Sequence, residues 1–315
     1  MKILVLGAGG VGGYFGGRLA QSGANVSFLV REKRKQQLDT QGLRIESHFG
    51  DATVPVITHL RTDIRPDYDL VVLTCKAYDL SDAMDTIEGA LGDNTVVLPL
   101  LNGVAHLELL NQRFGASRVW GGTAKIAATV TPDGVIRHLN QWHILTFGAQ
   151  DKIVSAKVKT FKAQLDKAGV TAVISPDITR DLWMKLVHLG TIATLTSLLR
   201  ANAGEINRTP DGKALFQRVL ETNIQIASRE GYPPDASFIA SYRELFSQSD
   251  SIYEASLARD IEKGGPIESD HILGFLLERC RAHGLPDDIP CLAYTHAKAY
   301  EQRRAANRLP ARAAA

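Results

Sequence analysis

Six residues near the start of the chain have the spacing of a dinucleotide-binding glycine loop. Residues 7–12 are Gly-Ala-Gly-Gly-Val-Gly and fit the pattern G-x-G-x-x-G. In such a loop the first glycine permits a tight turn, the second lets the backbone approach a pyrophosphate, and the third allows close packing of helix on strand. The helix that follows offers free N–H groups to phosphate. We therefore predict that the dinucleotide phosphates bind at Gly7, Ala8, Gly9, Gly10, Val11 and Gly12; the alternative is a glycine-rich turn without a ligand.

The residue after the second predicted strand favours one dinucleotide over the other. NAD sites usually place Asp or Glu there, about 20 residues beyond the loop, to bind the ribose 2′-OH. Here the strand ends at Val30 and Arg31 follows it. A guanidinium suits a 2′-phosphate by charge and by bidentate geometry. We predict that Arg31 binds this phosphate and that the cofactor is NADP(H), whereas the cations at 33–35 are interpreted as a solvated charge run.

A lysine stands inside the most apolar helical segment of the chain. Residues 181–200 are apolar nearly all round, and their interior holds two titratable groups, Lys185 and His188. Burial lowers the pKa of a lysine and makes it a usable proton donor near neutrality, which carbonyl reduction by hydride needs. The alternative is a lysine whose charge reaches the surface along its apolar stem. His188 is interpreted as a core histidine, with a ligand or catalytic role as the alternative.

Two other polar positions have both a structural and a functional interpretation. Glu268 follows Gly-Gly-Pro and opens a predicted helix, where an acidic residue complements the helix dipole. A catalytic or ligand-binding role is the alternative for it. Asn102 precedes Gly103 at the carboxyl end of a predicted strand, where doubly wound folds bind ligands, but Asn-Gly is also a common turn dipeptide. The local sequence leaves both pairs of interpretations open.

The elements that must position these residues alternate in the first half of the chain. Buried parallel strands are predicted over residues 2–6, 25–30, 69–75 and 95–98. A helix is predicted over residues 11–22, and the alternation of strands and helices predicts a Rossmann-type doubly wound α/β sheet. Residues 117–149 are predicted as antiparallel strands that close the sheet, and residues 152–168 as an amphipathic helix.

No convincing strand is predicted after residue 176. Helices are predicted over residues 181–200, 212–231, 237–246, 251–263 and 268–283. This shift predicts an NADP-binding Rossmann domain at 1–174 and an all-helical substrate and catalytic domain at 175–309, with a tail rich in Arg and Ala at 310–315. The cleft between two domains is the default place for a site.

Composition excludes several other classes of protein. The 315 residues, 44% of them hydrophobic, suffice for two folded domains, and 36 Lys and Arg against 34 Asp and Glu give no bias toward nucleic acid or an anionic membrane. Three scattered cysteines fit neither a disulfide framework nor a cysteine-based zinc site, and no metal site is expected. No apolar run of about 18–20 residues and no signal peptide is evident, so we expect a cytoplasmic protein without a membrane partner. The oligomeric state stays open, a homodimer included.

The ordered set of motifs resembles the ketopantoate reductase (2-dehydropantoate 2-reductase) family over nearly the whole chain. The likeness rests on the segments GAGGVGGYFGGRLA, CKAY, LNG, LWMKL, ASLARDIEKG and IESDHILGFL, in the order of the family. Each motif is modest alone, and the ordered set is specific. The resemblance implies an N-terminal Rossmann domain, a C-terminal helical domain, and reduction of ketopantoate to pantoate with NADPH in pantothenate biosynthesis.

The resemblance also implies roles at the reacting end of the substrate. Lys185 matches the proton donor of the family to the substrate carbonyl. Asn102 matches an asparagine that touches both the nicotinamide and the substrate, and Ser256 matches a serine that binds the substrate.

On the cofactor side the resemblance implies three further contacts. Lys76 matches a lysine that lines the cofactor cleft, and Ala128 matches a backbone contact to the nicotinamide. Glu268 matches a glutamate that meets the cofactor ribose or the end of the substrate and lies near the lysine.

The chain departs from the family pattern at two substrate positions. One and two turns after the catalytic lysine, the type enzymes carry asparagines that help to bind the substrate, and here these positions are Leu189 and Ala193. Loss of such hydrogen-bond partners changes substrate discrimination by orders of magnitude. Asn202 is a candidate to compensate, although its spacing differs.

The sequence therefore predicts an NADPH-dependent reductase of a small 2-oxo acid, with ketopantoate as the first candidate. A branched or larger 2-oxo acid is the second, because of the two apolar replacements. An imine reductase and a non-catalytic NADPH-binding sensor stay open as other classes. The presence of Lys185 argues against a sensor, which needs no proton donor.

Overall fold

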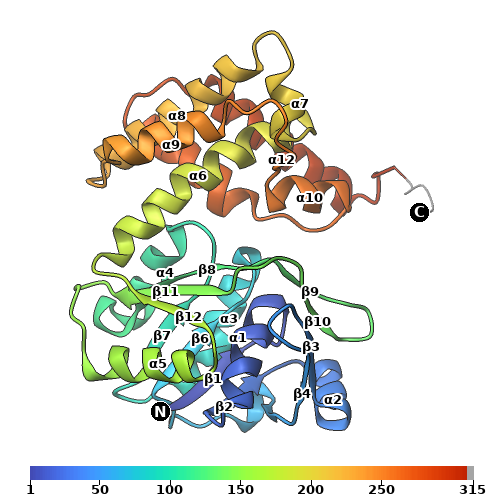
Figure 1. Cartoon of the computed structure of the whole chain (residues 1–315), viewed down its shortest axis with the longest axis vertical. Coiled ribbons are helices and arrows are strands. Elements are labelled where there is room, and N and C mark those ends of the chain that lie inside the picture. Colours follow the sequence, from blue (N-terminus) through green and yellow to red (C-terminus); the bar gives the residue numbers. More distant parts are fainter. Residues whose placement is uncertain (311–315) are drawn as a thin grey trace. The chain divides into compact units, whose positions relative to one another are not determined.

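Strand β1 (Lys2–Leu6) is the central strand of a five-stranded parallel sheet in the computed structural model, which describes residues 1–310 (Figure 1). The sheet order is β5 (Ile57–His59), β2 (Asn25–Leu29), β1, β6 (Leu70–Leu73) and β7 (Val96–Pro99). Val5 pairs with Phe28 on one side and Val72 on the other, and all three are buried. Burial on both faces explains an apolar run without alternation. Since the strands are parallel, their carboxyl ends share one edge, where Gly7 starts the first turn.

Helix α1 (Gly10–Gln21) connects β1 to β2 and packs closely on the sheet. A Cβ atom at Gly16 would lie 2.7 Å from the ring of Phe28, so this approach requires glycine. The other helical elements that follow in this half are α2 (Glu32–Gln41), α3 (Leu80–Ile87), α4 (Ala105–Phe114), α5 (Ala156–Lys167) and the 3-10 turns Arg61–Asp63, Ala77–Asp79, Glu88–Ala90 and Ala116–Arg118. The helices predicted over 11–22 and 152–168 are confirmed to within a few residues at their ends.

Two smaller sheets complete the N-terminal unit. The first has the order β12 (Thr171–Ile174), β11 (Ile144–Ala149) and β8 (Trp120–Lys125). The second has the order β4 (Ala52–Val54), β3 (Leu43–Glu46), β10 (Ile136–His138) and β9 (Ala128–Val130). The antiparallel pairing predicted between 117 and 149 is confirmed for β11 with β8 and for β10 with β9. These strands form separate sheets and do not close the five-stranded one, contrary to the prediction. One parallel bridge, between Val97 and Val119, joins β7 to the segment that leads into β8.

The C-terminal unit is helical, and residues 177–310 contain no strand. Its first helix is α6 (Ile178–Leu199). The later ones are α7 (Ala203–Asn207), α8 (Gly212–Arg229), α9 (Ala236–Leu245), α10 (Ser256–Glu262), the π-helical stretch Asp270–Gly274, α11 (Phe275–Ala282) and α12 (Asp288–Ala305). Together with the parallel sheet of the first unit, this confirms the predicted fold class.

Several elements differ from the sequence-based expectation. The strands β3, β4, β5 and β12 and the helices α7 and α12 had not been predicted. The strands are only three or four residues long and gain stability from partners distant in sequence, as β3 does from β10. Helix α10 begins at Ser256, later than the predicted residue 251, and the predicted helix 268–283 is divided by its π-helical start.

The chain divides into two compact units at Leu182 and Trp183, inside α6, where the sequence had suggested residue 174. The short segment Gly103–Ala105 belongs with the helical unit, and the rest of residues 1–182 with the sheets. Of the predicted tail at 310–315, residues 311–315 lie outside the described residues.

Helix α6 is also the most apolar long helix of the described chain. By length and composition alone it could cross a membrane, contrary to the expectation that no run was long enough, but 67% of its most apolar window is buried inside the protein. Core helices of soluble proteins show the same combination. A buried α6 therefore places Lys185 in an apolar helix that contributes to the core.

Candidate functional site

The glycine turn after β1 has the geometry that its sequence predicts. Gly7 adopts a φ of +93°, a backbone conformation that favours glycine, and its N–H donates to the carbonyl of Leu29 at 2.9 Å. The hydroxyl of Thr74 donates to the carbonyl of Leu6 at 2.8 Å and ties β6 to the same turn. The N-terminus of α1 begins at Gly10 directly behind this turn, so its free N–H groups lie at the sheet edge.

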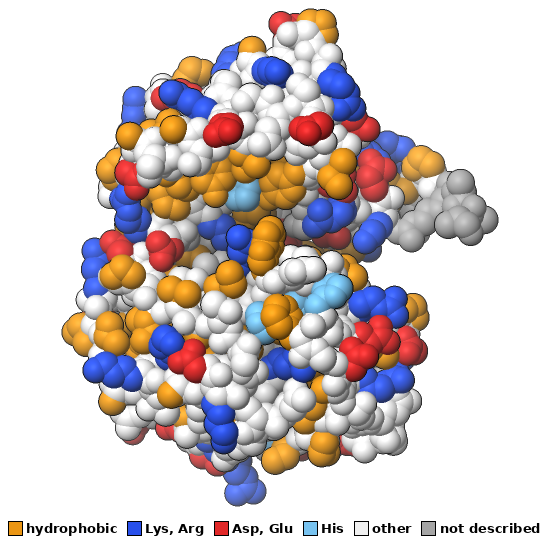
Figure 2. All heavy atoms as spheres, in the orientation of Figure 1, with side chains coloured by type: hydrophobic (Ala, Val, Ile, Leu, Met, Phe, Trp, Pro, Cys, Tyr) orange, Lys and Arg blue, Asp and Glu red, His pale blue; other side chains and the backbone are white. Residues whose placement is uncertain are grey.

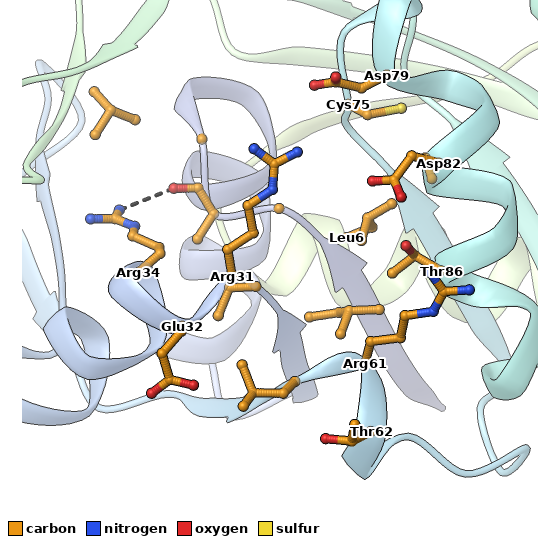
Figure 3. A pocket seen from close by; sticks show the side chains of 18 residues that line it. Leu6, Arg31, Glu32, Arg34, Arg61, Thr62, Cys75, Asp79, Asp82 and Thr86 are labelled. Atoms are coloured by element: carbon orange, nitrogen blue, oxygen red, sulfur yellow. Dashed lines mark hydrogen bonds between the residues drawn. The ribbon is translucent and has the colours of Figure 1, made fainter.

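A cavity of about 740 Å³ opens beside this turn within the N-terminal unit (Figure 3). Its floor is formed by Gly7, Ala8 and Gly9, which the sequence predicted to hold phosphate. Gly10, Val11 and Gly12 do not line it and belong to the first turn of α1. The volume is in the range of cofactor sites. The rest of the wall comes mainly from the ends of β2, β5 and β6 and the segments that follow them. Its residues are Leu6, Leu29, Val30, Arg31, Glu32, Arg34, Leu60, Arg61, Thr62, Cys75, Asp79, Asp82, Ala83, Thr86 and Val130.

Two arginines that line the cavity, Arg31 and Arg34, differ in their hydrogen bonding. Arg31 is exposed, and within residues 1–310 its guanidinium makes no hydrogen bond or ion pair, while Figure 3 shows it extending into the cavity. Arg34 instead donates to the carbonyls of Ala8 at 3.0 Å and Gly134 at 2.9 Å, and burial lowers its pKa, with Arg44 adding repulsion. Arg34 is therefore no part of a solvated charge run, contrary to the sequence interpretation. Arg31 is the guanidinium available to a ligand.

Acidic groups occupy the opposite wall. Asp79 and Asp82 lie at the start of α3, and Figure 3 shows them across the cavity from Arg31. Arg61, which the sequence analysis missed, lines the cavity from the turn after β5 and donates to the carbonyl of Asp85 at 3.0 Å. Charges of both signs therefore line the cavity, with Glu32 beside Arg31 at the end of β2 and Arg61 beside the aspartates at α3. The guanidinium of Arg31 offers a positive charge to an anionic group.

The glycines at 9 and 12 allow cofactor binding to be separated from folding. A Cβ at Gly12 would lie 2.2 Å from Thr74 Oγ1 and 2.5 Å from the carbonyl oxygen of Gly7, whereas a Cβ at Gly9 would meet nothing within 4 Å. We expect Gly12→Ala to destabilise the protein by about 2 kcal/mol, since overpacking forces the backbone to shift. We expect Gly9→Ala to leave stability unchanged and to weaken NADPH binding about tenfold, because the methyl fills the open cradle.

Thermal unfolding and NADPH titration of both variants test this expectation. A Gly9→Ala protein that binds NADPH as the wild type does would show that the cradle holds no pyrophosphate. A Gly12→Ala protein of wild-type stability would show that the contact with Thr74 is not tight in solution.

The other predicted cofactor residues lie outside the cavity wall. Lys76 is exposed and is the N-cap of the 3-10 turn Ala77–Asp79, next to the lining residue Cys75. Ala128 starts β9, and a Cβ at Gly10 would lie 2.5 Å from its carbonyl oxygen, so Ala128 packs directly against the start of α1.

The predicted proton donor lies beside an acidic residue in the helical unit. Lys185 occupies the second turn of α6, and Glu268, which is only 9% exposed, stands two residues before the π-helical stretch. Burial lowers the pKa of Lys185 to about 8, and the nearby carboxylate of Glu268 partly opposes this shift. A lysine with a pKa near 8 is largely protonated at neutral pH and gives up its proton readily. The structure therefore brings together the lysine and the glutamate, as the family resemblance implies, although the local sequence alone did not pair them.

Two other predicted substrate residues lie at the ends of elements or next to a tight turn. Ser256 is the first residue of α10. Asn102 is half-buried, and the glycine after it, Gly103, has a φ of +84° and would place a Cβ 3.1 Å from the carbonyl oxygen of His271. Gly103 therefore packs against the π-helical stretch that follows Glu268. π-Helical turns occur often at functional sites.

The apolar replacements on α6 differ in exposure. Ala193 is 2% exposed and lies in the interior, whereas Leu189 is half-buried. Asn202, the candidate to compensate for missing amides, is the N-cap of α7, and its side chain accepts a hydrogen bond from the backbone N–H of Glu205 at 2.9 Å. Its amide is therefore used to start a helix. In the described part of the chain, no group of three or more His, Cys, Asp or Glu side chains is arranged to hold a metal ion.

Comparisons with known proteins agree over nearly the whole chain. The family profile described as "Ketopantoate reductase PanE/ApbA" matches residues 3–152, and "Ketopantoate reductase PanE/ApbA C terminal" matches residues 177–301. An uncharacterized oxidoreductase of Bacillus subtilis, YkpB, is 31% identical over 96% of this chain and 100% of its own length. A 2-dehydropantoate 2-reductase of Halobacterium salinarum is 28% identical over 90% of this chain and 94% of its own. The crystal structure of a PanE/ApbA family ketopantoate reductase from Ralstonia eutropha JMP134 has a TM-score of 0.86 at 25% identity and covers 97% of this chain and 100% of that one.

Proposed function

Because the chain belongs to the ketopantoate reductase family, we propose that it reduces 2-dehydropantoate to pantoate with NADPH, in the cytoplasm, as a step of pantothenate biosynthesis. The protein is an NAD(P)-dependent oxidoreductase that acts on CH–OH groups. The specific cofactor, NADPH, and the specific substrate, 2-dehydropantoate, are our proposals within this class of oxidoreductases. The proposal rests chiefly on one observation: Lys185 has a pKa near 8 and lies beside the buried Glu268.

The cavity of the N-terminal unit supports NADPH as the reductant. The open cradle at Gly9 suits a pyrophosphate, and the exposed guanidinium of Arg31 at the end of β2 suits a 2′-phosphate. No acidic side chain occupies that position to receive a 2′-OH, since Glu32 comes one residue later, at the start of α2. The phosphates would be held by the backbone of residues 7–9 and the start of α1.

Lys185 supplies the proton that the reduction consumes. When bound, NADPH supplies a hydride to the carbonyl carbon of the 2-oxo acid. The carbonyl oxygen then gains negative charge, and Nζ of Lys185 donates a proton to it, which completes the alcohol and leaves the amine neutral. Glu268 holds the lysine in its charged form before transfer, because its carboxylate raises the pKa that burial lowers. Asn102 and Ser256 would bind the substrate carboxylate and hydroxyl, and Lys76, Ala128 and Glu268 would contact the cofactor.

A different 2-oxo acid is the second candidate substrate. Leu189 follows Lys185 by one helical turn and is half-buried, so the surface beside the lysine is apolar where the family pattern has an amide. An apolar group there favours a substrate without a hydroxyl at that position. Purified protein incubated with NADPH and either 2-dehydropantoate or a 2-oxo acid with an apolar side chain tests both. Formation of pantoate and NADP in equal amounts supports the proposal, and exclusive turnover of the apolar acid replaces it with the second candidate.

The pKa of Lys185 predicts an alkaline limit to the reduction. The donor must be protonated, so kcat should be constant below pH 8 and should fall about tenfold per pH unit well above it. Glu268→Gln removes the carboxylate that raises this pKa, and the alkaline fall in kcat should therefore begin at a lower pH. Glu278→Gln, which changes an exposed glutamate of α11, is the matched control and should leave the profile unchanged. If kcat of Glu268→Gln falls at the same pH as that of the wild type, Lys185 and Glu268 do not interact in solution.

A further inference from the structure

His188 of α6 makes a hydrogen bond that connects two parts of the helical unit. It follows Lys185 by three residues, so the two side chains are neighbours on the helix surface. Its Nε2 lies 2.9 Å from the hydroxyl oxygen of Tyr253, and the two rings lie 5.6 Å apart. The sequence analysis interpreted this position as a core histidine, with a ligand or catalytic role as the alternative. The structure gives it a specific partner 65 residues further along the chain.

Tyr253 has the same spacing from Ser256 that His188 has from Lys185. It stands three residues before Ser256, the first residue of α10. The segment between them is attached to α6 a second time, because the backbone N–H of Ala255 donates to the hydroxyl of Thr196 at 3.3 Å. Both hydrogen bonds join α6, which carries the proposed proton donor, to the segment that carries the proposed substrate serine.

The surroundings of this pair are aromatic. The ring centroid of His188 lies 4.9 Å from that of Tyr242 and 5.9 Å from that of Phe246. On the face that Figure 2 draws, the helical unit carries a patch of hydrophobic side chains. Burial raises the pKa of Tyr253, with Tyr242 adding to the shift and Arg259 opposing it, so its phenol stays neutral at physiological pH. A hydrogen bond among apolar rings is less exposed to competition from water than one at an open surface.

We propose that the Tyr253–His188 hydrogen bond is a positioning contact that sets the separation of Ser256 from Lys185 and thereby the affinity for the 2-oxo acid. His188 acts through Lys185 and Tyr253 acts through Ser256, since each stands three positions from that proposed substrate contact. The inference rests on the proposed function of Lys185 and Ser256. It assigns to His188 and Tyr253 a role in substrate binding, while proton transfer remains with Lys185.

Tyr253→Phe tests the contact with the smallest change, because it removes the hydroxyl and keeps the ring. We expect KM for the turned-over 2-oxo acid to rise about tenfold, as the loss of one part-buried hydrogen bond allows, with kcat and the Kd for NADPH within about threefold of wild type. Tyr242→Phe is the matched control, since Tyr242 contacts the same histidine ring and has no hydrogen bond to it. It should leave KM unchanged.

Substitutions at the other partner guard against a simple loss of folding. Glutamine at 188 can offer a hydrogen-bonding atom near the position of Nε2, so His188→Gln should keep KM close to wild type, whereas His188→Leu should raise it as Tyr253→Phe does. The double variant with His188→Leu and Tyr253→Phe should be no worse than either single one, because both remove one contact. Melting temperatures identify any variant whose KM changes only through unfolding.

The outcomes separate this inference from the proposed function. Wild-type turnover with an unchanged KM in Tyr253→Phe, or a lower melting temperature without a KM effect, overturns the positioning role and leaves the function intact. Additive effects in the double variant also overturn it. Absence of turnover of every 2-oxo acid by the wild type overturns the proposed function, and the inference with it. A KM increase shared by the two single variants and absent from His188→Gln and Tyr242→Phe supports it.

Discussion

Replacement of Lys185 by alanine should lower kcat for the 2-oxo acid about 10³-fold. A positioned general acid contributes roughly 10²–10⁴-fold to such a step. The loss is expected to be large here, because the carbonyl oxygen would gain charge beside the buried carboxylate of Glu268 without the positive charge of Lys185. NADPH binding should change less than threefold, since the cavity proposed to hold it is formed within residues 6–130 of the N-terminal unit.

Two variants separate proton donation from the charge of the lysine. Lys185→Arg keeps a cation but holds its proton at any accessible pH, so its kcat should also fall by at least about 10²-fold. Lys213→Ala removes an exposed lysine at the start of α8 and should behave as the wild type. Unchanged turnover in Lys185→Ala would assign the proton to another donor. Tight NADPH binding without turnover in the wild type would favour the non-catalytic sensor.

Replacement of Arg31 by alanine should abolish the preference for NADPH over NADH. Hydrogen bonds to a charged group are worth about 1.5–3 kcal/mol, so kcat/KM with NADPH should fall about 10–100-fold. The value with NADH should stay within about threefold, because NADH has no 2′-phosphate. Arg34 is not expected to replace Arg31, since its guanidinium is occupied by the carbonyls of Ala8 and Gly134.

Lys33→Ala is the matched control for the loss at Arg31. Lys33 is exposed and belongs to the same charged segment at the start of α2, but it does not line the cavity. Its replacement should leave both cofactor preferences unchanged. Equal losses in Lys33→Ala and Arg31→Ala would mean that the general positive charge of α2, and no specific contact, attracts the phosphate. Equal use of NADH and NADPH by the wild type would contradict the assignment of Arg31.

Local features of the chain were predictable from the sequence because their causes are local. The apolar run of β1, the positive φ needed at Gly7 and the helix start at Gly10 follow one another within ten residues. The buried character of α6 follows from its composition. The position of Arg31 in the cavity wall follows from its place directly after β2. Each of these depends on residues that are neighbours in the sequence.

Features that depend on distant partners could not be predicted in the same way. Strand β3 pairs with β10, about 90 residues away, and neither run is long enough to be recognised alone. Arg34 looked like one more surface cation until the fold brought the carbonyl of Gly134 to it. The nearness of Glu268 to Lys185 was implied only by the family resemblance, since the two residues lie 83 positions apart in the sequence and interact in the folded chain. Tertiary contacts decided each of these cases, and local propensity did not.

The most direct test of the account measures kcat/KM for NADPH oxidation with 2-dehydropantoate and with a panel of other 2-oxo acids, beside an amine-containing control reaction. The account predicts that NADPH is oxidised only when a 2-oxo acid is present, that 2-dehydropantoate has the highest kcat/KM, and that NADH is a poor substitute. Oxidation that depends on an added amine would identify an imine reductase. Binding of NADPH without oxidation by any acid in the panel would contradict the proposed function, even though the fold and the family remain as they are.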